Sequence, residues 1–406
     1  MYEPKLRFTA DDGSKFPDWE EKKLGEVATR VTRKNKDNIT NIPLTISSVD
    51  GLIDQRDFFN KVVASKDMSG YYLLNNGEFA YNKSYSKGYD FGSIKRLDLY
   101  DCGALSTLYI CFALDGKENS DFYQKYFDSL LWYSELQKIC AEGARNHGLL
   151  NVPTNDFFQL KLCVPSSKDE QKKIADFLSI IDAVIEKQKE TVEVWEERKK
   201  GVMQKLFSQN VRFKADDGSE FPDWKEKKMG DVCNTFSGGA PKSGEGRYYE
   251  NGTINFIRSG DIHGSNTELS ITEDGLNESS AKLVVIGDIL YALYGATSGE
   301  VDISKINGAI NQAILCIRPI DGYDRKFIVE ILRYNKENIL RKYLQGGQGN
   351  LSAQIIQGLH FEFPCLVEQQ KIEDCLSSLD DVIKKQKVTL ATWEEMKRGL
   401  LQQMFV

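Results

Sequence analysis

Two stretches of the chain, residues 170–207 and 368–405, repeat one pattern of apolar and polar positions. In each, the seam residues follow one another at alternating steps of four and three, which is the heptad spacing of a coiled coil. The pattern predicts two long helices that wrap around each other in a left-handed sense. Eight seam residues represent the two copies, which are 198 positions apart: Ile174, Ile181, Gln188, Trp195, Ile372, Leu379, Gln386 and Trp393.

The two predicted helices are expected to pack as antiparallel partners. Two repeats that each end in a seam helix pack simply about a pseudo-two-fold axis, and a helix of this length spans roughly 57 Å. Gln188 and Gln386 interrupt both seams near the midpoint, where a buried amide costs stability unless it is paired. We expect the two amides to meet near the axis and fix the register. The alternative is that both reach solvent.

A second duplication precedes the globular parts. Residues 8–27 recur at 213–232 with the same Ala-Asp-Asp-Gly-Ser and Phe-Pro-Asp-Trp strings. Asp-Gly and Phe-Pro steps are typical of turns and extended chain. Each copy is therefore expected to act as a linker that bends the chain and is anchored by Trp19 or Trp224.

Between these repeats lie two globular stretches with short β-rich runs. The predicted strands are 71–74, 79–81, 93–99 and 105–112 in the first, and 254–258, 283–285, 289–294 and 309–317 in the second. A helical pattern comes late in each, at 122–140 and 326–343. Gly77–Tyr81 and Gly103–Thr107 align with Gly287–Tyr291 and Gly308–Gln312, so the two stretches are expected to share one fold with diverged surfaces.

These patterns predict an α/β (α+β) protein with a pseudo-two-fold internal repeat, in which two long antiparallel coiled-coil helices separate two similar domains. The expected division is a linker at 1–27, a first domain at 28–163, a central spacer helix at 164–212, a repeated linker at 213–232, a second domain at 233–363 and a final spacer helix at 364–406.

Composition limits the possible chemistry. The net charge of −7 argues mildly against nucleic-acid binding, because Lys and Arg drive phosphate contacts; binding would need local patches or a more basic partner. Eight cysteines without a C-x-x-C pair, and only three histidines, favour reduced thiols over a metal site. The charged opening residues and the lack of a long apolar run lead us to expect a cytoplasmic protein.

A catalytic site is not predicted. Pro17-Asp18 with Glu20-Glu21-Lys22 superficially matches a nuclease's acids and lysine, but its second copy has Lys225 in place of Glu20. The chain contains no Asp-Pro-Pro-Tyr or Asn-Pro-Pro-Phe string for amino-methyl transfer. It also has no phosphate-binding loop, because Glu245 stands where the lysine is needed.

Taken together, the repeated motifs resemble the specificity subunits of type I restriction-modification systems over nearly the whole chain. The carriers are Pro165, Glu170–Ala175, Leu178–Asp182 and Trp195–Phe207, with Pro364, Glu368–Ile372, Leu376–Asp380 and Trp393–Phe405. Ser237–Pro241, Ile257–Asp261 and Asn311–Ala313 also resemble one class of target recognition domain, although Ala240 replaces the usual Thr.

The resemblance implies a non-catalytic subunit in which two target recognition domains each read half of a split, asymmetric DNA site. It implies that two modification subunits dock on the helices and methylate adenine with S-adenosylmethionine, and that restriction subunits translocate and cleave DNA with ATP and Mg. This chain is expected to bind no cofactor. The alternatives are a protein-only coiled-coil adaptor, or a self-contained nuclease or methylase.

A DNA-reading surface needs donors and acceptors on loops that follow strands. In the first domain the candidates are Arg30, Arg33, Lys34, Lys36, Asn82, Lys83, Ser84, Tyr85, Lys87, Arg145 and Asn146. In the second domain they are Arg258, Ser259, Asp261, Tyr294, Thr297, Asn311, Gln312, Gln348 and Asn350. The alternatives are a solvated basic face for residues 30–36 and ordinary polar turns for the loops.

Overall fold

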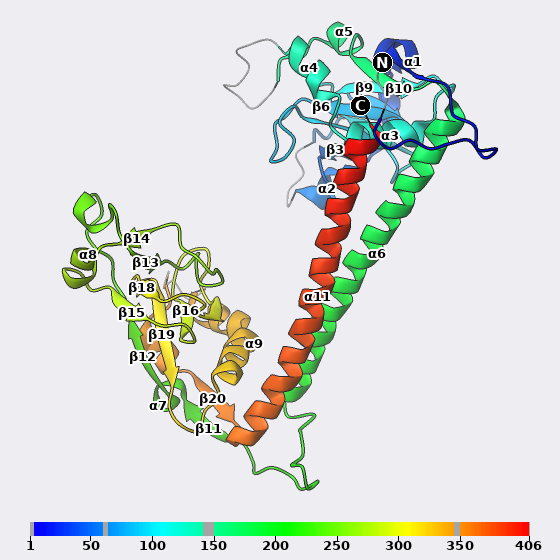
Figure 1. Cartoon of the computed structure of the whole chain (residues 1–406). Helices are drawn as coiled ribbons and strands as arrows, with labels where there is room; N and C mark the ends of the chain where they lie inside the picture. Colours follow the sequence, from blue (N-terminus) through cyan, green and yellow to red (C-terminus); the bar gives the residue numbers. More distant parts are fainter. Residues whose placement is uncertain (1–3, 60–63, 141–149, 345–349, 406) are drawn as a thin grey trace. The chain divides into compact units, whose positions relative to one another are not determined.

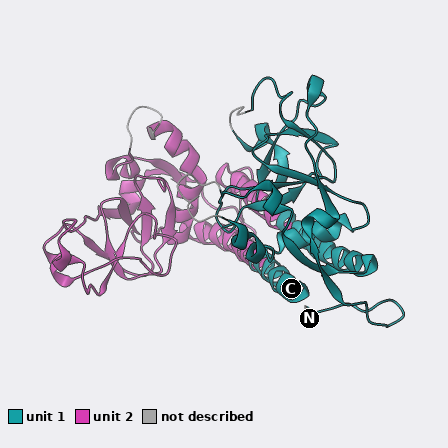
Figure 2. Cartoon of the chain, turned by 90° about the horizontal axis from the view of Figure 1, so that it is seen from above, with its two compact units in different colours: residues 1–190, 388–406 teal, residues 191–387 magenta. Residues whose placement is uncertain are grey.

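The chain folds into two compact units, which Figure 2 shows in separate colours: residues 1–190 with 388–406, and residues 191–387. The structure is a computed structural model that describes residues 4–59, 64–140, 150–344 and 350–405. Arg145, Asn146 and Gln348 lie outside the described residues. We call the two units unit 1 and unit 2.

In the described part of unit 1, ten strands form three sheets (Figure 1). Two sheets have four strands, in the orders β2-β9-β6-β7 and β4-β3-β8-β5, and β1 pairs with β10. All neighbours are antiparallel except β3 and β8. The strands are β1 Trp19–Lys23, β2 Ala28–Arg30, β3 Pro43–Ser47, β4 Gly51–Asp54, β5 Tyr72–Asn75, β6 Phe79–Asn82, β7 Ser93–Arg96, β8 Cys102–Leu105, β9 Ile110–Leu114 and β10 Lys161–Pro165.

Unit 2 repeats this topology. Its sheets have the orders β12-β19-β16-β17, β14-β13-β18-β15 and β11-β20, with β13 and β18 as the parallel pair. The two stretches that the sequence aligned weakly therefore share one fold. The strands are β11 Lys225–Lys228, β12 Cys233–Ser237, β13 Ile254–Ile257, β14 Ser270–Ile271, β15 Lys282–Val284, β16 Ile289–Ala292, β17 Val301–Ile303, β18 Gly308–Ile310, β19 Ile314–Pro319 and β20 His360–Phe363.

The central strands β6 and β16 are mostly apolar because each faces two cores. In β6, Phe79 and Tyr81 join an aromatic cluster with the late helices, while Ala80 joins a second cluster between the four-stranded sheets. In β16, Tyr291 likewise joins one core cluster and Leu290 the other. The two-residue period of a strand sends alternate side chains to opposite faces, so continuous apolar runs indicate strands buried on both sides.

Short helices and turns complete the units. Unit 1 contains α1 Leu24–Val27, α2 Gln55–Phe58, α3 Ser120–Asp128, α4 Tyr133–Ile139 and α5 Thr154–Phe157, with a 3₁₀ turn η1 at Lys36–Asn38. Unit 2 contains α7 Met229–Val232, α8 Glu273–Asn277, α9 Arg325–Leu344 and α10 Ala353–Gln357, with η3 at Gly246–Tyr248.

Three predicted elements are in fact divided. The run 105–112 forms the end of β8 and the start of β9, because a turn at Ser106–Tyr109 separates them. The run 309–317 divides likewise into β18 and β19. The predicted helix 122–140 is two helices, α3 and α4, and Leu130 between them adopts a left-handed φ of 62°, which a continuous α-helix excludes.

Two long helices, α6 Lys168–Phe207 and α11 Leu366–Met404, each contribute to both units. In unit 1, Ile174 and Leu178 of α6 share a core cluster with Leu401 and Met404 of α11. In unit 2, Leu206 shares a cluster with Ile372 and Leu376. Low residue numbers on one helix meet high numbers on the other, so the helix segments within each unit are antiparallel (Figure 1).

Burial along the helices follows the heptad seam. Ile174, Ile181 and Ile372 are buried, and the other representative seam residues are partly buried: Gln188, Trp195, Leu379, Gln386 and Trp393. The Arg198 guanidinium lies 4.5 Å from the centre of the Trp195 ring. No helix within the described ranges is both long enough and apolar enough to cross a membrane.

The duplicated linkers close both units with the same contacts. In unit 1, Arg7 Nε donates to Glu170 Oε1 at 2.7 Å, and Trp19 Nε1 donates to the same oxygen at 3.2 Å. In unit 2, Arg212 and Trp224 bond Glu368 at 2.8 and 3.2 Å. We call each Arg-Glu-Trp set a junction. Both glutamates are fully buried, so each charge depends on its arginine.

Candidate nucleic-acid interface

Two loops of unit 1 meet where their strands end. β3 and β8 are parallel, so their carboxyl ends lie at one edge, and Ser48 follows β3 there. Its hydroxyl is 2.9 Å from Ser86 Oγ and 3.0 Å from Ser93 Oγ. The hydrogen bonds bring the β3–β4 hairpin against the loop that follows β6. We call this region the reading edge of unit 1.

The reading edge of unit 1 contains an open pocket of about 410 Å³. Gly92 holds one wall in place: its φ is +77°, and a Cβ there would lie 1.9 Å from the Asn82 carbonyl oxygen. Polar and aromatic side chains line the pocket together. They include Ser47, Ser48, Asp50, Phe58, Asn82, Ser84, Tyr85, Ser86, Lys87 and Tyr89.

Candidates at 82–87 divide into structural and exposed groups. Asn82 Oδ1 accepts a hydrogen bond from the Ser84 backbone, which leaves the Asn82 amide group as a donor. Lys83 donates to the Val152 carbonyl, and burial, with the nearby Arg30 charge, lowers its pKa. Tyr85 is 61% exposed. Lys87 is exposed and forms no ion pair with any described residue.

The basic run at 30–36 carries less free charge than its sequence indicated. Arg33 donates to Glu78 Oε2 at 2.7 Å, so that cation is already paired with an acid of the same unit. Lys34 bonds the Gly70 carbonyl and lies 4.2 Å from the centre of the Tyr72 ring. Arg30 and Lys36 are exposed and remain candidates for phosphate contact.

Unit 2 forms its reading edge from equivalent strands. Arg258 follows β13 and Asn311 follows β18, and these strands are parallel. Asn311 N donates to the Ile257 carbonyl at 3.3 Å, which brings the two loops together. Gly238 lies against the same edge, where a Cβ would be 1.9 Å from the Ile310 carbonyl oxygen. Only glycine allows this close backbone approach.

The main cation of this edge already forms ion pairs with acidic side chains. Arg258 Nη2 donates to Glu268 Oε2 at 2.7 Å, and its Nε is 3.5 Å from Asp261 Oδ2. Glu268 is the chief reason that the pKa of Arg258 is raised. Asp261 also accepts from the Arg258 backbone at 2.9 Å, so its carboxylate shapes the turn. Ser259 is partly buried beside it.

The remaining unit 2 candidates surround the end of β16. Burial raises the pKa of Tyr294, and a hydrogen bond with Gln312 opposes that shift. Thr297 Oγ1 is buried without a hydrogen-bond partner among the described residues. Asn311 Oδ1 accepts from the Ala313 backbone. Asn350 is exposed, and its neighbour Leu351 donates to the Leu293 carbonyl, so Asn350 lies beside this edge.

The sequence reasoning missed the β3–β4 hairpin. Ser48, Val49 and Asp50 line the pocket, and Val49 is 77% exposed. An available signal was the Asp50-Gly51 step between two apolar runs, which is typical of a hairpin turn. Phe58 and Tyr89 were also missed, because single aromatic residues in irregular segments carry no periodic pattern.

Comparisons with known proteins agree with this geometry. Residues 222–391 match the family model described as the type I restriction modification DNA specificity domain. The MjaVIII type I restriction enzyme specificity subunit of Methanocaldococcus jannaschii is 26% identical over 317 residues, covering 74% of this chain and 72% of that protein. The MjaX specificity subunit of that organism, named as putative, is 26% identical, covering 69% and 66%.

Solved structures show the same fold. The crystal structure of the type I restriction-modification S subunit from M. genitalium has a TM-score of 0.55 and 16% identity, covering 99% of both chains. A chain from a structure describing assembly of a type I restriction-modification system has a TM-score of 0.57 and 19% identity, covering 95% of this chain and 97% of that one. The chain is thus similar in sequence to the specificity subunits of type I restriction-modification systems, and its fold is that of a solved subunit of this kind.

Proposed function

We propose that the chain reads a bipartite, asymmetric DNA sequence, with one half-site for each unit, and contributes no catalytic group. The reading edges carry the proposal. The two units share strand order and junctions, yet their equivalent loops present different side chains: an open pocket with Asn82 and Lys87 in unit 1, and Arg258 with Asn311 in unit 2. One scaffold with two unlike reading edges suits two unlike half-sites.

The antiparallel helix segments support an inverted arrangement of the half-sites. We expect equivalent loops of the two units to contact opposite DNA strands. Since the loops differ, the recognised site is not a palindrome.

The long helices are the proposed docking surface for two adenine methyltransferase subunits. Ile180, Val194, Val388 and Met396 are exposed on α6 and α11, and a docked partner would cover such side chains. Glu196, Glu197, Arg198 and Lys200 lie exposed among them. S-adenosylmethionine would be bound by those partners, and ATP and Mg by restriction subunits, in a cytoplasmic complex.

Domain exchange in the host tests the division of labour. Residues 28–163 are replaced by the corresponding domain of another specificity subunit, and methylated adenines are mapped across the genome. We expect one half-site to change while the other half-site and the gap between them stay the same. A change in both half-sites would contradict separate reading.

Helix length provides the matched experiment. Adding equal numbers of residues to α6 and α11 in whole heptads keeps the seam in phase. We expect the gap between the half-sites to change while both half-site sequences persist. Incubation of the purified chain with DNA, Mg²⁺ and S-adenosylmethionine tests the catalytic alternative, because nicks or methylation without partners would refute a non-catalytic role.

A further inference from the structure

The late helix of each unit meets the long helices through the same framework. Asn119 caps α3 and Asp324 caps α9, each by accepting from a backbone N–H three residues later. Their own backbone N–H groups donate to Gln171 and Gln369 at 2.9 and 2.7 Å. Residues of α3 therefore correspond to residues 205 positions later in α9. This equivalence pairs Lys125 with Glu330, and Asp128 with Arg333.

Strand register adds a third corresponding pair. Ala80 faces Lys95 across β6 and β7, and Leu290 faces Asp302 across β16 and β17. Because β6 and β16 are equivalent strands, Lys95 corresponds to Asp302. All three corresponding pairs therefore have opposite charges in the two units.

In unit 1 a cation of the recognition domain meets the helices. Lys125 Nζ donates to Asp182 Oδ2 of α6 at 2.5 Å, and Lys397 of α11 bonds the other oxygen of Asp182 at 2.6 Å. Behind Lys125, Lys95 donates to Asp128 at 2.7 Å. Lys125 is only 11% exposed, so its charge depends on Asp182.

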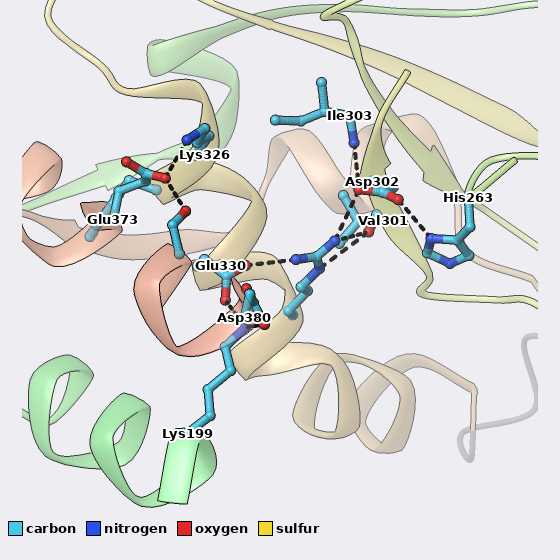
Figure 3. Close-up of polar contacts among 12 residues, drawn as sticks. Lys199, His263, Val301, Asp302, Ile303, Lys326, Glu330, Glu373 and Asp380 are labelled. Atoms are coloured by element: carbon cyan, nitrogen blue, oxygen red, sulfur yellow. Dashed lines mark hydrogen bonds and ion pairs between the residues drawn. The ribbon is translucent and has the colours of Figure 1, made fainter. Parts of the chain in front are cut away.

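In unit 2 an anion takes the corresponding place, as Figure 3 shows. Glu330 Oε2 lies 3.2 Å from Lys199 Nζ of α6, and Lys199 also donates to Asp380 of α11 at 2.7 Å. Behind Glu330, Arg333 donates to Glu330 at 2.7 Å and to Asp302 at 3.0 Å. Glu330 is only 7% exposed.

The helix residues keep their charges while the domain residues exchange theirs. Asp182 corresponds to Asp380, and Lys397 to Lys199, through the 198-residue repeat. Each unit thus presents a bonded Asp-Lys pair from two helices. A carboxylate accepts several hydrogen bonds and an ammonium donates three, so each pair has capacity left for a third charge of either sign.

We propose that the Asp182–Lys397 and Asp380–Lys199 pairs are docking sites that accept a recognition domain carrying either charge at the contact position. A cationic domain residue binds the aspartate, and an anionic one binds the lysine. The neighbouring domain positions, 95 and 128 or 302 and 333, change sign with it and keep the domain internally balanced. The proposal concerns how domains attach and is independent of DNA reading.

Single substitutions in the full chain test the inverted pairing. Thermal unfolding and hydrogen exchange of the α3 and α9 peptides are measured for four variants. In unit 1, Asp182→Asn should lower the melting temperature by about 4 °C. This decrease should be larger than the decrease caused by Lys397→Met, because Asp182 is the partner that binds Lys125. In unit 2, Lys199→Met should lower the melting temperature more than Asp380→Asn does, because Lys199 is the partner that binds Glu330. The proposal would be overturned if the aspartate substitution caused the larger decrease in melting temperature in both units, or if the lysine substitution did so in both.

A transplant of charge sharpens the test. The variant Lys95→Asp/Asp128→Arg/Lys125→Glu gives unit 1 the charges of unit 2, and Lys125→Met gives a neutral contact of similar length. We expect the transplant to melt within about 2 °C of the parent and above Lys125→Met. In the transplant, Lys397→Met should become more damaging than Asp182→Asn.

Exposed Lys117→Glu controls for the change in net charge. A transplant that melts below Lys125→Met, or fails to fold, contradicts a docking site that accepts both charges. An unchanged order of Asp182→Asn and Lys397→Met in the transplant contradicts it as well.

Discussion

The junctions and the reading edges of the two units have diverged to very different degrees. Arg7, Trp19 and Glu170 recur as Arg212, Trp224 and Glu368 with nearly the same distances. At the reading edges, equivalent strands lead into loops with different side chains: Asn82 and Lys87 line the pocket of unit 1, and Arg258 follows β13 in unit 2. Contacts that close the fold tolerate little change, whereas loops at strand ends can change without disturbing a core.

The reading edges also differ in free charge. Lys87 is exposed and forms no ion pair among the described residues of unit 1, while Arg258 of unit 2 is held by Glu268 and Asp261. Binding of phosphate or guanine by Arg258 requires exchange of one carboxylate for the ligand. Unit 1 is therefore expected to supply more of the electrostatic attraction to DNA.

The largest predicted effect concerns a junction. Glu170→Ala leaves Arg7 and the Trp19 indole without their buried acceptor, and should lower the free energy of unfolding by about 3 to 5 kcal/mol. Glu368→Ala should produce a similar loss through unit 2. Denaturant unfolding followed by tryptophan fluorescence measures both.

Glu186→Ala is the matched control for the junctions. Glu186 lies on α6 with 66% of its side chain exposed and pairs with Lys189, so its removal should cost below about 1 kcal/mol. Junction variants as mild as this control would show that the two repeated contact sets are not what closes the units.

A smaller effect is expected at the reading edge of unit 1. In the proposed complex with methyltransferase subunits, Lys87→Ala should weaken DNA binding and reduce the slope of log K against log salt by about 1, because the proposed phosphate contact of Lys87 is lost. Arg33→Ala removes an equal charge that already pairs with Glu78, and should leave the slope unchanged. Equal effects of the two substitutions would show that net charge, rather than the reading edge, sets binding.

The smallest predicted effect is acid sensitivity. Burial alone would raise the pKa of Asp182, but hydrogen bonds from Lys125 and Lys397 outweigh burial and lower it below 3.8. Its stabilising contribution is therefore complete well above pH 3.8, and is lost as pH falls through the lowered pKa. Urea unfolding between pH 2.5 and 5 measures this loss. On acidification, the free energy of unfolding of Asp182→Asn should fall less than that of the parent protein, by about 1 kcal/mol at most after solvent screening.

Exposed Asp176, which pairs with Lys172 on the helix surface, provides the control for this pH series. Asp176→Asn should follow the parent curve. If Asp182→Asn also follows it, the contact between α3 and α6 contributes nothing to acid sensitivity.

The long helices and several strands of the four-stranded sheets were predictable from the pattern of apolar positions. A seven-residue repeat identified Ile174 and Ile372 as seam positions, and short continuous apolar runs identified β6 and β16. The break at Leu130 was not predictable, since the apolar pattern continues through it. The turn after Ser106 was missed because only two polar residues, Ser106 and Thr107, separate the apolar residues of the flanking strands.

The reading edges were predictable as loops and less so as surfaces. Sequence order placed Asn82 after a predicted strand and Arg258 at the end of one, but the hydrogen bonds of Ser48 to Ser86 and Ser93 depend on strand pairing between distant segments. The pairing of Arg33 with Glu78 was hidden for the same reason. Whether a charged side chain is free to bind a ligand depends on its neighbours in the folded structure, and residue type alone does not identify those neighbours.

The end of α11 has a consequence for biosynthesis. Phe405 packs 5.6 Å from Phe122 and 6.5 Å from Trp19, measured between ring centres, and thus completes the aromatic core of unit 1. Residues 191–387 form unit 2 as one continuous segment and emerge from the ribosome before Phe405. The unit that begins first in translation is therefore finished last, and until then the ring faces of Trp19 and Phe122 stay open to chaperones and proteases.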